Sequence, residues 1–229
     1  MKQIALDIGL ATGPTLASYF SGPNEAALRH LELWAGAAHS GSVLRSPVPS
    51  YLWGAQGSGK THLLKAVQAT LREQGARVGW LDAGMLDPPE FDEQWAAVIF
   101  DDVQFYSALQ QQVAFNWFVN AQTHQRAVLA AGAVPPAELK LRDDLRTRLG
   151  WGHVYQLQLL SESERRAVLR QSADARGVFL GDDVMDFMLT RFSRDLGSLL
   201  ELLDLIDNYA LQTKRAITIP LIKSMMEES

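Results

Sequence analysis

The sequence contains no cysteine among its 229 residues. This absence excludes a disulfide framework, a thiolate metal site and a cysteine nucleophile. A chain without disulfides is compatible with a reducing compartment, and we expect a cytoplasmic location.

An excess of positive charge is also missing. The chain has 21 Lys and Arg against 26 Asp and Glu, which gives a formal net charge of −5. Domains that bind nucleic acid through its phosphates usually carry a basic excess. We therefore expect no direct sequence-specific DNA binding by this chain.

Long hydrophobic runs are absent as well. The uninterrupted apolar segments are short, such as Ala96–Phe100, and none has the length of a bilayer span. Met1–Gly13 contains one lysine and no long apolar core, unlike a secretory signal. We expect no membrane association. Hydrophobic residues still make up 47% of the chain, which is enough for a sizeable core.

Short apolar segments alternate with helical patterns over the first two thirds of the chain. The predicted strands are Tyr51–Trp53, Val78–Asp82, Ala96–Asp101, Ala127–Gly132 and Val154–Leu157. The predicted helices are Glu25 to about His39, Lys60 to about Gln74, Leu109–Gln125, and one opened by Pro135-Pro136 that runs toward Arg148. This alternation predicts an α/β fold, with a parallel five-stranded sheet flanked by helices.

The pattern becomes entirely helical after Leu160. Ser161 and Glu164 have the spacing of a capping box, which predicts a helix from there to Arg176. Further helices are predicted over Asp182–Phe192, Asp195–Lys214 and Pro220–Glu228. The predicted organisation is a tail over residues 1–22, an α/β base over 23–160 and a small all-helical domain over 161–229.

A glycine-rich loop separates the first predicted strand from the helix that follows. Its sequence, Gly54-Ala55-Gln56-Gly57-Ser58-Gly59-Lys60-Thr61, matches G-x-x-x-x-G-K-[ST] at every fixed position. Such glycines let backbone N–H groups point at phosphate oxygens, while the lysine reaches the β and γ phosphates. Thr61 is a candidate Mg²⁺ ligand, and His62 follows it as a candidate packing neighbour of the nucleotide. An ordinary glycine turn is the alternative, but the strand before the loop and the helix after it favour a phosphate loop.

Two acidic residues end the apolar strand Ala96–Asp101. The carboxyl ends of parallel strands meet at one edge of the sheet, so Asp101 and Asp102 are expected beside the phosphate loop. Asp101 is the candidate Mg²⁺ partner, and Asp102 the candidate for orienting or activating the attacking water. Two solvated acids at a strand end would be the alternative.

Several stretches together resemble one protein family. Gly59–Leu64, Phe100–Phe105 and Arg146–Gly152 are similar to the phosphate loop, the acidic strand end and the arginine-finger segment of the bacterial replication initiator DnaA. With Pro135–Leu139 they identify the chain as similar to the DnaA branch of the AAA+ family. The resemblance implies an AAA+ base, a helical lid from Ser161, and bound ADP or ATP with Mg²⁺. We expect no DNA-binding helix-turn-helix domain after the lid.

The resemblance also assigns roles to single residues. Arg148 matches the arginine that acts on a nucleotide held by a neighbouring subunit, and Arg146 and Arg142 remain alternatives nearby. Arg194 matches a lid arginine that contacts the phosphates. Tyr19 stands where the family places an aromatic near the adenine, although apolar packing explains it almost as well.

The first residues resemble a peptide that binds the DNA sliding clamp. Gln3, Ile4, Leu6 and Ile8 supply a glutamine amide and apolar side chains that suit a groove on a partner. Asp7 stands where proline is usual in such peptides. A frayed terminus with chance apolar residues is the alternative.

Two departures from the family pattern lower the expected rate of intrinsic ATP hydrolysis. Ala131 and Ala133 stand where related proteins usually carry polar side chains near the γ-phosphate, and alanine offers neither donor nor acceptor. Asp102 replaces the glutamate of many AAA+ ATPases. The five histidines show no metal-binding spacing.

Three functions compete at this point. The leading hypothesis is a nucleotide-binding regulator that joins the sliding clamp and offers Arg148 to DnaA, so that the ATP bound by DnaA is hydrolysed. An independent ATPase motor or helicase-loading factor is the second. A small-molecule phosphotransferase is disfavoured by the helical domain and the Arg146–Gly152 segment. The resemblance also allows a homo-oligomer.

Overall fold

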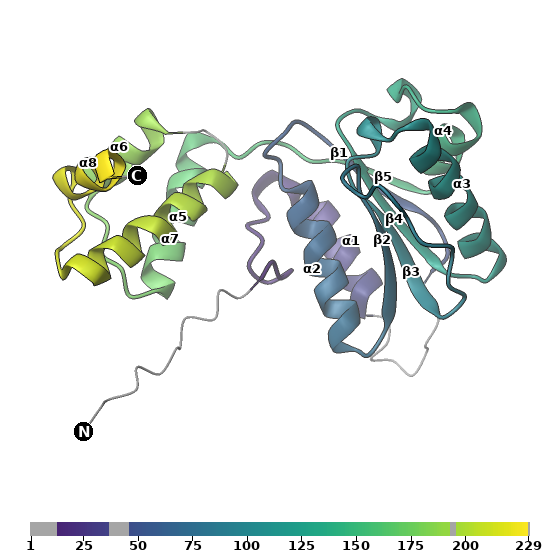
Figure 1. The fold of residues 1–229 in the computed structure, drawn as a ribbon, viewed down its shortest axis with the longest axis horizontal. Helices are drawn as coiled ribbons and strands as arrows, with labels where there is room; N and C mark the ends of the chain where they lie inside the picture. Colours follow the sequence, from purple (N-terminus) through teal and green to yellow (C-terminus); the bar gives the residue numbers. More distant parts are fainter. Residues whose placement is uncertain (1–12, 37–45, 193–195, 229) are drawn as a thin grey trace. The chain divides into compact units, whose positions relative to one another are not determined.

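The computed structural model describes residues 13–36, 46–192 and 196–228 (Figure 1). They form two compact units, an α/β unit that extends to Gln158 and a helical unit that begins at Leu159.

A five-stranded parallel sheet forms the centre of the α/β unit. Its strands are β1 Ser50–Trp53, β2 Arg77–Leu81, β3 Trp95–Phe100, β4 Ala127–Gly132 and β5 His153–Gln156. The strand order is β2-β3-β4-β1-β5, and every neighbouring pair is parallel. The carboxyl ends of β1, β3 and β4 therefore meet along one edge of the sheet. The residues predicted to bind the nucleotide phosphates and Mg²⁺ follow β1 and β3 at this edge.

Helices cover both faces of this sheet (Figure 1). Helices α1 Glu25–Gly36 and α2 Lys60–Glu73 pack on one face through Leu31, Leu63 and Leu64. Helices α3 Ala108–Thr123 and α4 Asp143–Leu149 pack on the other face through Trp117, Phe118 and Leu145. All six residues of β4 are buried, as an apolar strand covered on both sides should be. The predicted α/β class and sheet are confirmed.

The predicted helix from Pro135-Pro136 toward Arg148 is wrong as a single element. The chain instead forms one 3₁₀ turn, η4 Pro136–Glu138, then an extended segment, and α4 begins only at Asp143. The extended backbone sends both Leu139 and Leu141 into the core, where they are 2% and 8% exposed, and leaves Lys140 outside. This alternation is the period of a strand, so burial of the two leucines overrides helix continuation.

Further 3₁₀ turns lie at η1 Gly22–Asn24 and η3 Val103–Phe105. The turn η3 leads from the end of β3 into α3, which starts with a capping box. Ser107 accepts a hydrogen bond from the Gln110 N–H, and the Gln110 side chain accepts one from the Ser107 N–H. The described part of α1 ends at Gly36, and the last residues of the longer predicted helix lie outside the described residues.

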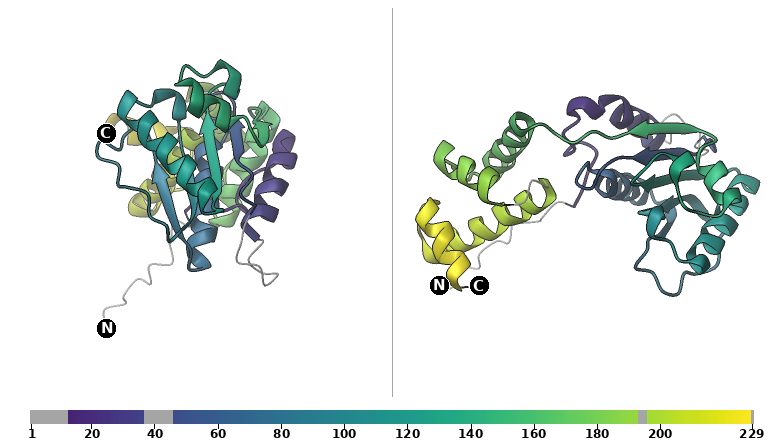
Figure 2. Two further views of the ribbon diagram at one scale, coloured as in Figure 1. Left: turned by 90° about the vertical axis from the view of Figure 1, so that its right-hand side faces the viewer. Right: turned by 90° about the horizontal axis from the view of Figure 1, so that it is seen from above.

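The helical unit consists of α5 Glu162–Ala175, α6 Asp182–Arg191, α7 Leu196–Thr213 and α8 Ile219–Glu228 (Figure 2). Its own core includes Leu169, Met185, Leu199 and Leu203. The predicted capping box is present, because Ser161 accepts from the Glu164 N–H while the Glu164 carboxylate accepts from the Ser161 N–H. Among the described residues, no helix combines the length and apolar character that crossing a bilayer requires.

Candidate nucleotide site and arginine surface

The phosphate loop connects β1 to α2 at the carboxyl edge of the sheet. Gly57 and Gly59 have φ angles of 81° and 89°, in the left-handed region that favours glycine. A Cβ atom on Gly59 would also lie 2.7 Å from Cε2 of Tyr19. The backbone therefore favours glycine at Gly57 and at Gly59, the second of which is a fixed position of the motif. Gly54 and Ser58 are buried, and α2 begins directly after Gly59.

Lys60 lies at the first turn of α2 and is only 7% exposed. Its Nζ donates to the carbonyl oxygens of Gly54 at 2.8 Å and Ala55 at 3.0 Å. Burial lowers the pKa of Lys60, and the charges of Asp102 and Asp101 oppose that shift. The ammonium group is thus held within the loop, where an anion would be a stronger partner than two carbonyls.

Thr61 and Asp101 are brought together across the loop. The Thr61 hydroxyl donates to Oδ2 of Asp101 at 2.8 Å. Asp101 is 4% exposed, and burial raises its pKa while the Thr61 hydrogen bond opposes the shift. Mg²⁺ in nucleotide sites takes one or two protein oxygens together with phosphate oxygens and water. One hydroxyl and one buried carboxylate at this distance fit that ion, which would polarise the phosphates.

Asp102 follows Asp101 at the turn that ends β3. Its backbone is left-handed, with φ 50° and ψ 45°, and it caps η3. Its Oδ1 accepts from Nε2 of Gln104 at 3.0 Å, and Oε1 of Gln104 accepts from the Ala133 N–H at 3.0 Å. The sequence analysis missed Gln104, because a contact 29 residues away leaves no local signal.

Tyr19 and His62 lie beside the loop. Their ring centroids are 5.7 Å apart, and Nε2 of His62 lies 3.3 Å from the Thr15 carbonyl oxygen. Buried Asn24 donates to the Tyr19 hydroxyl at 3.1 Å and to the Gln158 carbonyl at 3.0 Å. Asn24 is a second residue that sequence reasoning missed, and it fixes the Tyr19 hydroxyl.

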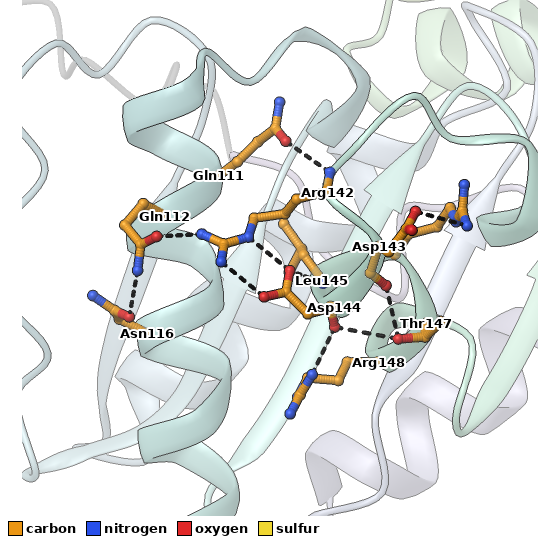
Figure 3. A network of polar contacts seen from close by, with 10 residues as sticks. Gln111, Gln112, Asn116, Arg142, Asp143, Asp144, Leu145, Thr147 and Arg148 are labelled. Carbon is orange, nitrogen blue, oxygen red and sulfur yellow. Dashed lines mark hydrogen bonds and ion pairs between the residues drawn. The ribbon is translucent and has the colours of Figure 1, made fainter.

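The three candidate arginines lie on and beside α4, and they differ in their partners. Figure 3 shows two of them, Arg142 and Arg148. Arg142 binds the Asp144 carboxylate with two nitrogens, at 2.6 and 2.8 Å, and also contacts Gln112. Arg146 pairs with Asp143 at 2.9 Å. Two of the three guanidinium groups are therefore neutralised within the chain.

Arg148 has a different environment. Its Nη1 donates to the Asp144 carbonyl at 2.8 Å (Figure 3). Its Cζ lies 4.8 Å from the Phe115 ring centroid and 5.4 Å from that of Trp151. No carboxylate of the described residues forms an ion pair with it. The guanidinium is supported by a carbonyl and two aromatic faces, which orient it without a direct ion pair.

Some predicted residues cannot be placed. Arg194 and the peptide residues Gln3, Ile4, Leu6 and Ile8 lie outside the described residues. The roles assigned to them, and to the residues of the phosphate loop and α4, stay predictions.

Comparison with known families identifies the helical unit. Residues 162–226 match the family described as "Hda, lid domain". The helical unit is therefore similar to the lid domain of Hda. This Hda lid spans α5, α6, α7 and most of α8.

Solved structures show the same fold over almost the whole chain. Domain III of the replication initiator DnaA from Thermotoga maritima has a TM-score of 0.72 and 19% identity, covering 93% of this chain and 95% of that one. AMPPCP-bound DnaA from Aquifex aeolicus has a TM-score of 0.66 and 20% identity, covering 83% of this chain and 65% of that one. The RuvB branch migration motor of Thermotoga maritima has a TM-score of 0.61 and 18% identity, covering 89% and 68%.

The α/β unit with its helical lid thus has the AAA+ fold of DnaA domain III. The Hda lid and this fold together confirm the predicted resemblance to the DnaA branch of the AAA+ proteins.

Proposed function

We propose that this chain is a cytoplasmic, nucleotide-binding AAA+ regulator of replication initiation. With the DNA sliding clamp, it promotes hydrolysis of the ATP bound by DnaA, and Arg148 acts in trans on that ATP. The observation that carries the proposal is the guanidinium of Arg148, which forms no direct ion pair with a described carboxylate, in a chain that has a complete phosphate loop and a helical unit matching the Hda lid.

The position of Arg148 in the fold supports action on a neighbouring molecule. Helix α4 packs on one face of the sheet through Leu145 and Leu149, whereas α2, which carries Lys60 and Thr61, packs on the opposite face. A guanidinium on the far face is poorly placed for phosphates at its own loop. It can stabilise charge that develops on a phosphoryl group held by a partner.

The surroundings of the three arginines favour Arg148 over its neighbours. Arg142 and Arg146 would each have to leave a carboxylate before they could bind a phosphate. Arg148 would exchange only a backbone carbonyl while the rings of Phe115 and Trp151 continue to support it. Trp151 is 64% exposed, so a partner can reach this surface.

The retained ligand is proposed to be ADP or ATP with Mg²⁺. Lys60 and the backbone of the phosphate loop would hold the phosphates, and Thr61 and Asp101 would hold the ion. A triphosphate analogue is bound in a solved DnaA of this fold. Gln3–Ile8 is proposed to bind the clamp, and the chain is proposed to assemble with DnaA rather than to bind DNA itself.

The decisive experiment is single-turnover hydrolysis of labelled ATP bound to DnaA, with DNA-loaded clamp. Arg148→Ala should reduce the stimulated rate by about 10³-fold or more, the usual range for an arginine supplied in trans. Its ADP affinity should stay unchanged, because α4 lies across the sheet from the phosphate loop. Arg148→Lys should remain impaired, since an ammonium lacks the planar guanidinium fork.

Arg146→Ala is the matched control on the same helix, and it should stimulate like the parent protein. Equal stimulation by Arg148→Ala and the parent would refute the trans role of Arg148, and Arg146 and Arg142 would become the candidates.

An independent ATPase or helicase-loading factor is the second candidate function. The specific observation in its favour is that the chain has its own acids for hydrolysis, with Asp101 bonded to Thr61 and Asp102 bonded to Gln104. A solved structure with the same fold, the RuvB protein of Thermotoga maritima, is described as a branch migration motor. Rapid ATP turnover by the chain alone, without stimulation of DnaA, would favour the motor over the regulator.

A further inference from the structure

One amide side chain connects the ends of two neighbouring strands. Gln104 lies in η3, one residue beyond Asp102–Val103, and is half-buried. Its Nε2 donates to Oδ1 of Asp102, and its Oε1 accepts from the N–H of Ala133, each at 3.0 Å. Ala133 is the first residue after β4, and Asp102 is the second residue after β3. The amide therefore links the ends of these two strands.

The chemistry of the partners fixes the orientation of this amide. A backbone N–H can only donate, so it requires the Gln104 oxygen on its side. An ionised carboxylate can only accept, so it requires the Gln104 nitrogen. Reversing the amide would lose both hydrogen bonds. The Gln104 amide can therefore form both hydrogen bonds in only one of its two orientations. That orientation directs its nitrogen at the Asp102 carboxylate.

The strand end on the other side of the bridge has no polar side chain of its own. Ala130, Ala131, Gly132 and Ala133 occupy the last positions of β4 and the residue after it. Asp102 itself has left-handed backbone, with φ 50°, which an isolated aspartate adopts only in a minority of cases. Both the direction of its carboxylate and its backbone therefore depend on nearby contacts, of which the Gln104 amide is one.

We propose that Gln104 is a positioning residue for Asp102, and that it supplies the side-chain amide that the alanines at the end of β4 do not. It holds the Asp102 carboxylate where that group orients the water that attacks a nucleotide bound by this chain. The proposal rests on the nucleotide site of the proposed function, but not on the action of Arg148 on DnaA.

Two substitutions distinguish a role of Gln104 in positioning Asp102 from a role in accepting the Ala133 N–H alone. Gln104→Met has similar length and keeps neither contact. Gln104→Glu keeps an acceptor for the Ala133 N–H but places a carboxylate oxygen against Oδ1 of Asp102. A role in satisfying Ala133 alone would leave Gln104→Glu like the parent, whereas positioning of Asp102 makes both variants defective.

Gln111 provides a matched control. Its amide also bridges two groups, accepting from the Arg142 N–H at 2.9 Å and donating to the Tyr106 carbonyl at 2.9 Å, but it touches no acidic residue. Gln111→Met therefore removes a comparable pair of hydrogen bonds without affecting Asp102.

The test compares ADP affinity by calorimetry, thermal unfolding, and the single-turnover rate at which the chain hydrolyses its own bound ATP. Both Gln104 variants should bind ADP within about twofold of the parent, while hydrolysis slows by about 10²-fold, the usual cost of a misplaced catalytic group. Gln111→Met should hydrolyse at the parent rate, even if it unfolds at a lower temperature. Gln104→Met combined with Asp102→Asn should be no slower than Asp102→Asn alone, because both changes remove one function.

Parent-like hydrolysis by either Gln104 variant would overturn the inference, as would a further loss of rate in the double variant. A parent that binds ADP but hydrolyses none of its bound ATP would overturn it too, while leaving the proposed regulator intact. ADP-loaded Gln104→Met should still stimulate DnaA, since that activity depends on Arg148. A failure of the regulator is thus distinguishable from a failure of this inference.

Discussion

At the scale of single residues, the site is organised around a buried positive charge. Among the described residues, Lys60 has only carbonyl oxygens as hydrogen-bond partners, and burial lowers its pKa. A buried cation without a strong counterion is costly, and a bound phosphate would offset that cost. Lys60 is therefore the residue at which nucleotide binding should be most sensitive to substitution.

Lys60→Ala should weaken ADP binding by about 2 kcal/mol or more, because a charge-assisted contact to the phosphates is lost. This loss is about 30-fold in the dissociation constant. Isothermal calorimetry measures it directly. Lys65→Ala is the matched control, since Lys65 is exposed on the same helix and should not affect binding. Absence of ADP and ATP binding by the parent would contradict the nucleotide-binding prediction.

Residues whose chemistry is encoded locally could be predicted from the sequence, and others could not. The spacing of Gly59, Lys60 and Thr61 and the acids after an apolar strand carry their own signal. Gln104, Asn24 and Phe115 act through contacts with residues far away in the chain. No periodicity reveals such contacts, because they depend on how the strand ends and helices come together.

At the scale of elements, the sequence predicts where a helix begins better than whether that helix continues without interruption. The capping box at Ser161 marks the start of α5 correctly, since it is a local exchange of hydrogen bonds. The segment after Pro136 was predicted as helix, but two buried leucines require an extended backbone. The competition between helix propensity and burial is settled by tertiary packing, which the local sequence does not contain.

Ser161→Ala should destabilise the helical unit by about 1 kcal/mol, because α5 loses its N-cap. Ser172→Ala within the same helix should slightly stabilise the helical unit, since alanine has a higher helix propensity than serine. Urea unfolding followed by far-ultraviolet circular dichroism tests both substitutions. Equal midpoints for Ser161→Ala and the parent would contradict the importance of the cap.

The same cap predicts a dependence on pH. Hydrogen bonds from the Ser161 hydroxyl and N–H lower the pKa of Glu164. A carboxylate whose pKa is lowered by folding stabilises the fold above its unfolded pKa, and that contribution disappears as the pH falls through the folded pKa. The difference between Ser161→Ala and the parent should therefore shrink below about pH 4.

At the scale of the whole molecule, the chain combines an α/β unit and an Hda lid, each with its own core. The described apolar core starts at Leu16, and residues 1–12 lie outside the described residues. Because chain termini usually contribute little to a core, we expect a binding function of the first eight residues to be separable from the stability of both units.

Deletion of residues 1–8 should abolish co-elution with the sliding clamp and leave the thermal unfolding profile nearly unchanged. Gln3→Ala should weaken the same association, and Lys2→Ala serves as its neighbouring control. Size-exclusion chromatography with purified clamp measures the complex. A truncated chain that binds the clamp as well as the parent would place the contact elsewhere.

The division into two units also determines which unit fluorescence and circular dichroism each report on during unfolding. All six tryptophans precede Gln158, and three of them, Trp34, Trp95 and Trp117, lie in the cores of the α/β unit. The segment from Leu159 to Ser229 contains none. Tryptophan fluorescence therefore follows the α/β unit alone, whereas far-ultraviolet circular dichroism follows helices in both. One denaturant titration read by both signals distinguishes joint from separate melting, with no label attached to either unit.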